Sequence, residues 1–76
     1  MGGRGPQRLG VVIHVAEAHG CKVFHPNKGS HWKFKKDGCR TYPIPAHNGL
    51  KTQIAWSYIQ GLCRCMGIPE DAFLNN

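Results

Sequence analysis

The residues of this chain best suited to chemistry are Lys28-Gly29-Ser30-His31, followed at once by Trp32-Lys33-Phe34-Lys35-Lys36. Histidine is the side chain that most readily exchanges a proton near neutral pH. Lysines around it attract phosphate, and their charge repulsion favours the neutral imidazole that can accept a proton. A histidine at the start of a basic and aromatic segment therefore suggests acid–base chemistry on a phosphate backbone.

Each candidate also has a plainer interpretation. A single histidine on a surface is usually no more than a polar side chain, and Gly29-Ser30 also suits a simple turn into a strand. His47 is our candidate for a second proton-transfer group, although an exposed loop histidine is the commoner case. The remaining histidines belong to no such group, and we interpret them as surface residues: His14, His19 and His25.

The positive charge is concentrated in the middle of the chain. The formal net charge is +6, and residues 21–52 hold seven lysines and arginines against one acid, which also gives +6. Such a region is typical of a protein that binds a polyanion or docks an acidic protein. A solvated face that only aids solubility is the alternative.

Length and composition restrict the class of protein. We expect one small domain over residues 1–76, with residues 1–5 as a flexible arm. No run is long and apolar enough to cross a membrane, and the N-terminus lacks the apolar core of a signal peptide, so we expect a cytoplasmic protein. The four cysteines are expected to be free thiols, their spacing gives little support to a zinc site, and we expect no cofactor.

The spacing of apolar residues predicts an α+β fold with the order α-β-β-β-α. The expected elements are a helix from Gln7 to His19, strands at Cys21–His25 and Ser30–Lys36, a third strand ended by Pro43 and Pro45, and a helix from Gln53 to Met66 with Thr52 as N-cap. Gly20 and Gly67 stop the helices, and Phe73 folds back on the core. The natural packing is a three-stranded antiparallel sheet with both helices on one face.

The dipeptide Asp37-Gly38 predicts a two-residue type I′ turn. That turn would set Lys35 opposite Arg40, and an anion would relieve the repulsion between them. Because side chains alternate between faces, the open face is predicted to hold His31, Lys33, Lys35, Arg40 and Tyr42. The face toward the helices is predicted to hold Trp32, Phe34 and Thr41.

The order of these parts resembles the HicA family of bacterial toxins. The matching parts are Gly29-Ser30-His31, Asp37-Gly38, Pro45-Ala46-His47 and the tail Gly67-Ile68-Pro69-Glu70-Asp71-Ala72-Phe73. The resemblance implies a double-stranded-RNA-binding-like fold and an mRNA interferase, with His31 as the catalytic histidine. It also implies inhibition by a HicB-like antitoxin, expected to be acidic, that covers the active site.

We therefore expect the toxin of a type II toxin–antitoxin system, an endoribonuclease that cleaves mRNA without a metal. His31 would act as base or acid on the RNA 2′-hydroxyl. The residues expected to bind RNA are Lys28, Gly29, Ser30, Lys33, Lys35, Arg40 and His47. Two alternatives stay open, namely a non-catalytic RNA-binding module of the same fold and a basic domain that docks an acidic protein.

Overall fold

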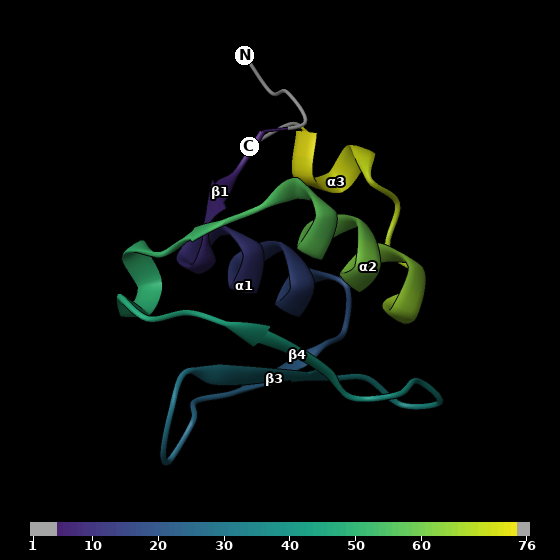
Figure 1. The fold of residues 1–76 in the computed structure, drawn as a ribbon. Coiled ribbons are helices and arrows are strands. Elements are labelled where there is room, and N and C mark those ends of the chain that lie inside the picture. Colours follow the sequence, from purple (N-terminus) through teal and green to yellow (C-terminus); the bar gives the residue numbers. More distant parts are fainter. Residues whose placement is uncertain (1–4, 75–76) are drawn as a thin grey trace.

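Two helices lie on one face of a three-stranded antiparallel sheet in the computed structural model, which describes residues 5–74 (Figure 1). The elements are β1 (Gln7–Arg8), α1 (Leu9–Ala18), β2 (Lys22–Phe24), β3 (His31–Lys35), β4 (Tyr42–Pro45), the 3₁₀ helix η1 (Gly49–Lys51), β5 (Gln53–Ile54), α2 (Trp56–Met66) and α3 (Asp71–Leu74). The predicted α+β fold and its α-β-β-β-α arrangement are confirmed. Of the predicted flexible arm, residues 1–4 lie outside the described residues, and Gly5 is exposed.

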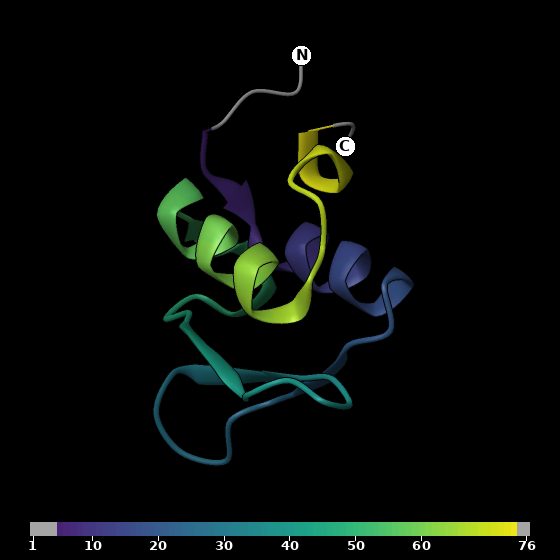
Figure 2. The same ribbon diagram turned by 90° about the vertical axis from the view of Figure 1, so that its right-hand side faces the viewer.

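The core lies between the sheet and the helices. Figure 2 shows α1 and α2 side by side above the sheet, with α3 on their far side. The largest fully buried side chains come from all these elements: Leu9, Val12, Phe34, Ile44, Ile59, Leu62, Met66 and Phe73. As predicted, Gly67 ends α2 in the left-handed conformation, with φ 68°, and Phe73 folds back into the core.

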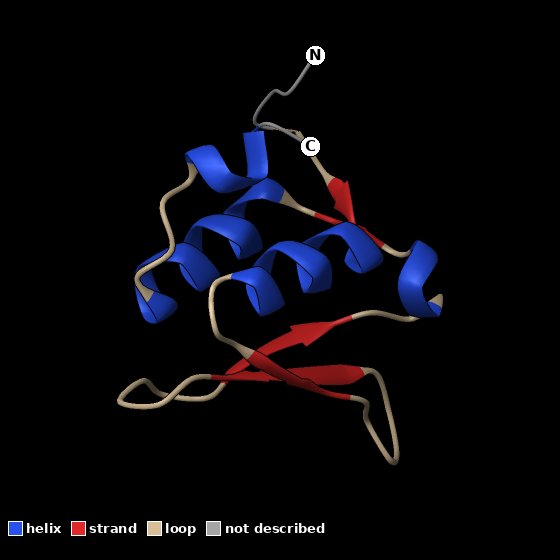
Figure 3. Ribbon diagram, turned by 180° about the vertical axis from the view of Figure 1, so that it is seen from behind, coloured by secondary structure: helices blue, strands red, loops and turns tan. Residues whose placement is uncertain are grey.

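A second, two-stranded sheet was not predicted, and it changes where both helices begin. β1 pairs antiparallel with β5 on the side of the helices away from the main sheet (Figure 3). As a result, α1 begins at Leu9 and α2 at Trp56, each later than predicted. Thr52 is not an N-cap, since its hydroxyl accepts a hydrogen bond from the Asn48 N–H at 2.8 Å. In the described part of the chain, no helix has the length and apolar character needed to span a membrane.

The register between β3 and β4 is shifted by one residue from the predicted one. Phe34 pairs with Tyr42 rather than with Thr41, which sets Ile44 opposite Trp32. In the predicted register Ile44 would lie on the open face of the sheet, whereas it is fully buried. Because a shift of one residue exchanges the two faces of a strand, the burial of Ile44 decides the register.

The turn between these strands also differs from the prediction. A type I′ turn needs positive φ at both central residues, and only Gly38 has it, at 79°. The turn spans Lys36 to Cys39, where the Cys39 N–H donates to the Lys36 carbonyl at 3.0 Å. Positive φ at the third position alone is the pattern of a type II turn.

Three residues of this hairpin therefore change place. Tyr42 lies on the helix face, not the open one, and its hydroxyl donates to the Tyr58 carbonyl of α2 at 3.0 Å. Thr41, predicted to pack on the helices, is exposed in the loop between β3 and β4. Arg40 lies in the same loop and does not pair with Lys35. Lys36 contacts the helix layer instead of the open face. Its ammonium donates a hydrogen bond to the Met66 carbonyl at the end of α2, at 3.1 Å.

Pro45 is the last residue of β4, as predicted, whereas Pro43 lies inside the strand. The strand order β2-β3-β4 makes β4 an edge strand, where the missing N–H of proline costs no ladder hydrogen bond if it faces outward. Prolines at such an edge also hinder pairing with another chain. The prediction that prolines end this strand is therefore confirmed for Pro45 and wrong for Pro43.

All four cysteines are free thiols, as predicted, but they differ in burial. Cys21 and Cys63 are buried, and Cys39 and Cys65 are half-buried. Burial, with a smaller effect of Glu70, raises the pKa of Cys63 to about 11, and burial raises that of Cys21.

Only the thiolate reacts with disulfide reagents. In native protein at pH 8 we expect two fast and two slow thiols in a reaction with an aromatic disulfide, followed by absorbance.

Unfolding in guanidinium serves as the control, because all four thiols should then react at one rate. The raised pKa of Cys63 also makes the stability of the fold depend on pH. Since the folded pKa of Cys63 exceeds that of the unfolded chain, its contribution to stability is complete below about pH 9 and is lost as the pH rises toward 11. Four equal rates in the native protein would contradict the burial of Cys21 and Cys63.

Candidate functional site

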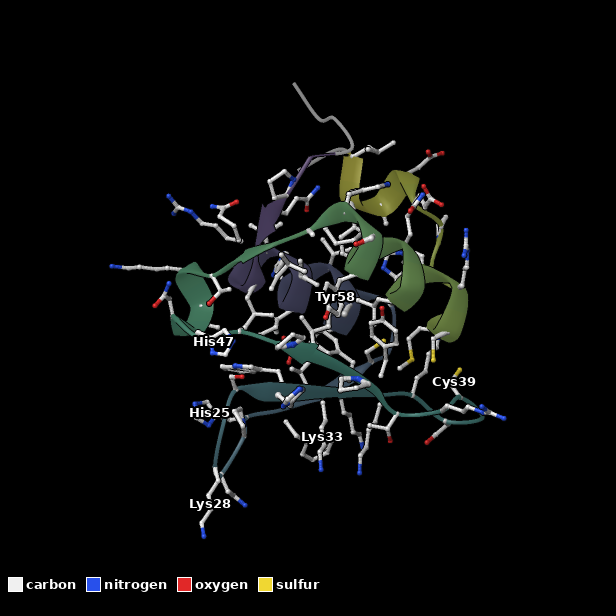
Figure 4. All side chains as sticks on the ribbon, in the orientation of Figure 1. His25, Lys28, Lys33, Cys39, His47 and Tyr58 are labelled. Atoms are coloured by element: carbon white, nitrogen blue, oxygen red, sulfur yellow. The ribbon has the colours of Figure 1, made fainter. Side chains whose placement is uncertain are left out.

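The open face of the sheet, turned away from both helices, carries the basic side chains. Its residues alternate with the more buried ones along each strand, and they are Lys22, Phe24, His31, Lys33, Lys35, Pro43 and Pro45. Figure 4 shows Lys28 and Lys33 projecting away from the helices on this side. The structure thus places a cationic surface on the face that the helices leave uncovered.

A hollow of about 500 Å³ opens on this face at the end where β3 begins. Its wall is formed by the chain that leaves β2 and by the outward side chains of β3, which are Phe24, His25, Pro26, Asn27, Lys28, His31, Lys33 and Lys35. The hollow brings together four of the predicted site residues, namely His31 and three lysines. An anion held in it would lie beside an imidazole, which is the arrangement needed for proton transfer at a phosphate.

Gly29 and Ser30 position this site rather than line it. Gly29 has φ 75° and is exposed, so it allows a bend between β2 and β3 that other residues rarely adopt. The Ser30 carbonyl accepts a hydrogen bond from the Ala46 N–H at 2.7 Å, which continues the β3–β4 ladder by one step. Together they fix the point at which His31 enters the strand.

Two further predicted site residues, Arg40 and His47, also lie outside this hollow. Arg40 follows Cys39 at the opposite end of the sheet from Lys28 (Figure 4). The four residue steps from His31 to Lys35 alone span about 13 Å, and Arg40 lies beyond them. His47 is exposed near the same end of the sheet as His31, but it does not line the hollow.

His25 does line the hollow, although its sequence position gave no sign of this. Its Nδ1 lies 2.8 Å from the Pro26 carbonyl, and its ring meets the Trp32 ring edge-on with 4.7 Å between centroids. A carbonyl only accepts, so Nδ1 carries the proton and Nε2 is left to exchange one. The loop of residues 25–30 brings His25 back beside the start of β3, and this contact is set by the fold and not by a sequence pattern.

Like charges are held close together on this surface. Lys22 is directly opposite Lys35 in the β2–β3 ladder, an unfavourable arrangement on a solvated sheet face. The Lys35 ammonium lies 5.1 Å from the centroid of the Phe24 ring, a cation–π contact that offsets part of this cost. A bound anion would relieve the remaining repulsion between Lys22 and Lys35. The same effect was predicted for Lys35 and Arg40, but those two residues do not pair.

Among residues 5–74, no three or more histidine, cysteine or acidic side chains are grouped so as to hold a metal ion. Comparison of the chain with models of protein families, with curated proteins and with solved structures gives no match. The site is therefore interpreted from its own geometry and charge.

Proposed function

We propose that this protein is an endoribonuclease that cleaves mRNA, with His31 as its catalytic histidine. The observation that carries the proposal is the hollow in which His31 and three lysines meet on an uncovered basic face. The resemblance to HicA toxins supports the same activity and adds the class, a toxin of a type II system. We further propose that it acts in the cytoplasm, where its substrate lies.

The proposed mechanism uses the 2′-hydroxyl of RNA as its nucleophile. The imidazole of His31 accepts the 2′-hydroxyl proton while the oxygen attacks the adjacent phosphorus. The bond from phosphorus to the 5′-oxygen breaks, and the products are a 2′,3′-cyclic phosphate and a 5′-hydroxyl end. Lys28, Lys33 and Lys35 stabilise the negative charge that develops on the phosphate oxygens.

The leaving 5′-oxygen needs a proton, and His25 is better placed than His47 to supply it. His25 lines the hollow, and its hydrogen bond to the Pro26 carbonyl directs proton exchange to Nε2. His47, our first candidate, lies outside the hollow. We therefore assign the second proton transfer to His25.

An acidic antitoxin of the HicB type would inhibit this enzyme by covering the same face. The open face carries Lys22, Lys33 and Lys35 within one short sheet. An acidic protein surface bound to these lysines would at the same time keep RNA from them. Competition between the partner protein and RNA is thus a direct consequence of the proposed site.

The experiment that tests the function is cleavage of a defined RNA by purified protein in the presence of EDTA. We expect fragments that end in a 2′,3′-cyclic phosphate, and no cleavage where a deoxynucleotide replaces the residue whose 2′-oxygen would attack. Intact RNA that the protein nevertheless binds would favour the non-catalytic module. Absence of RNA affinity, with tight binding of an acidic protein, would favour the docking domain.

The lysines of the open face predict a strong dependence of RNA binding on salt. If Lys22, Lys28, Lys33 and Lys35 each contact one phosphate, the logarithm of the affinity falls with a slope of about −3 against that of the salt concentration. Lys33→Gln should make that slope shallower by about 0.7 and weaken binding. The measurement is fluorescence anisotropy of a labelled RNA that is 2′-O-methylated and so resists cleavage.

Arg40→Gln is the matched control, because it removes one charge at the far end of the sheet. It should leave the slope close to that of the unchanged protein. Equal effects of Lys33→Gln and Arg40→Gln would mean that RNA responds to total charge, and that the hollow has no special role.

A further inference from the structure

Phe24 is an apolar ring on the basic face. It projects from β2 with 46% of its surface exposed, and the helices cover the other side of the sheet. It lies on the wall of the hollow that holds His31 and also on that of a second hollow of about 360 Å³ toward the β3–β4 turn. The ring therefore separates two depressions along one cationic surface.

One ammonium group contacts this ring, and two more lysines are its neighbours on the same face of the sheet. Lys33 is its partner in the β2–β3 ladder, and Lys22 lies two residues away on the same face of β2. The Lys35 ammonium is 5.1 Å from the ring centroid. A ligand suited to this surface must offer a planar face to the ring and negative charge to the lysines.

We propose that Phe24 stacks against an unpaired nucleobase of the RNA while the lysines hold the phosphates on either side. This inference rests on the proposed function and extends it, since it makes the substrate single-stranded. Bases inside a duplex are already stacked and cannot reach a side chain on a flat sheet face. The carboxylates of an acidic protein segment would pair with the lysines, but they have no aromatic face to stack on the ring.

The test compares Phe24→Ala with the unchanged protein on two labelled oligodeoxynucleotides of eight nucleotides. One carries bases, and the other is abasic with the same number of phosphates. Neither has the 2′-hydroxyl that the proposed cleavage requires, so both survive the measurement by fluorescence anisotropy. We expect Phe24→Ala to weaken binding of the base-bearing strand about 5- to 100-fold and to leave the abasic strand unchanged.

Variants of the same position separate stacking from bulk. Phe24→Leu keeps an apolar side chain but loses the aromatic face, so it should weaken binding nearly as much as alanine. Phe24→Trp should retain the affinity, and its fluorescence should be quenched by the base-bearing strand only. Tyr58→Ala, which removes a ring with 40% exposure on α2, should change neither binding curve. Circular dichroism confirms that each variant is folded.

Equal weakening of both strands by Phe24→Ala would overturn the inference, because it would indicate an effect on charge or fold. Unchanged binding of both strands would overturn it too, and would leave Phe24 as a contact for a protein partner. The nuclease proposal is judged separately by RNA cleavage. If the protein binds nucleic acid through Phe24 but leaves RNA intact, the cleavage proposal is refuted and the stacking proposal stands. If it cleaves RNA while Phe24→Ala leaves binding unchanged, the stacking proposal is refuted and the cleavage proposal stands.

Discussion

Replacing His31 by alanine is expected to reduce RNA cleavage by about 10²- to 10⁴-fold, the usual contribution of a general base. The side chain is exposed at the first residue of β3, so its removal leaves the buried core untouched. RNA binding should persist because the lysines of the hollow remain. The measurements are the rate of cleavage of an end-labelled RNA and, in bacteria, growth arrest on induction of the protein.

The other two histidines near this end of the sheet supply the controls. His25→Ala should lower the cleavage rate by a similar factor, because the leaving oxygen would lose its proton donor. His47→Ala should retain nearly full activity, since His47 does not line the hollow. Growth arrest by both the unchanged protein and His31→Ala would contradict a catalytic role. The reverse order of effects for His25 and His47 would return the second role to His47.

The order of helices and strands was predictable because the spacing of apolar residues along the chain indicates which side chains are buried. As predicted, α1 buries Leu9, Val12 and Ala16. Gly20 follows the end of α1 and Gly67 follows the end of α2, also as predicted. The alternation within residues 31–35 correctly placed His31, Lys33 and Lys35 on the open face. These features depend on neighbours in the sequence, where a periodic pattern carries the information.

The register of the hairpin was not predictable from its turn residues. Asp37-Gly38 favours one pairing, whereas the burial of Ile44 under α2 and α1 requires the pairing shifted by one residue. A turn gains little free energy compared with burial of a whole side chain. This error had placed Arg40 and Tyr42 on the open face, whereas the predicted positions of His31, Lys33 and Lys35 on that face were correct.

The residues that the sequence analysis missed are those that tertiary contacts define. β1 and β5 have two residues each, too few to show a period, and they pair across more than forty residues of chain. His25 and Phe24 line the hollow because a loop and a neighbouring strand bring them beside β3. No spacing in the sequence expresses that proximity.

Gly61→Ala is expected to destabilise the protein by about 2 kcal/mol, although alanine is the better helix former by about 1 kcal/mol. Gly61 lies in α2 under the ring of Tyr42, and an added Cβ would overlap the phenol oxygen and lie 2.9 Å from Cζ. The ring must then move, and the hydrogen bond from the Tyr42 hydroxyl to the Tyr58 carbonyl is lost. Thermal unfolding should show a midpoint lower by roughly 8 to 16 °C.

Gly10→Ala in α1 is the matched control, because a Cβ there would meet Leu50 at 3.6 and 3.7 Å, ordinary van der Waals contact. It should raise the free energy of unfolding by about 0.5 to 1 kcal/mol. A double-mutant cycle identifies the cause of the loss at Gly61. In a Tyr42→Leu background the overlap is gone, so Gly61→Ala should cost little or become stabilising.

The same contact connects stability to the site. Tyr42 pairs with Phe34 across β3 and β4, and burial raises the pKa of its phenol, so the hydroxyl stays protonated and donates to α2. Displacement of the ring by Gly61→Ala should loosen the sheet against α2 while leaving His31 and its lysines chemically intact. RNA cleavage below the unfolding temperature should therefore fall far less than with His31→Ala. An additive cycle, with the full loss kept in the Tyr42→Leu background, would show that Gly61 is required for another reason.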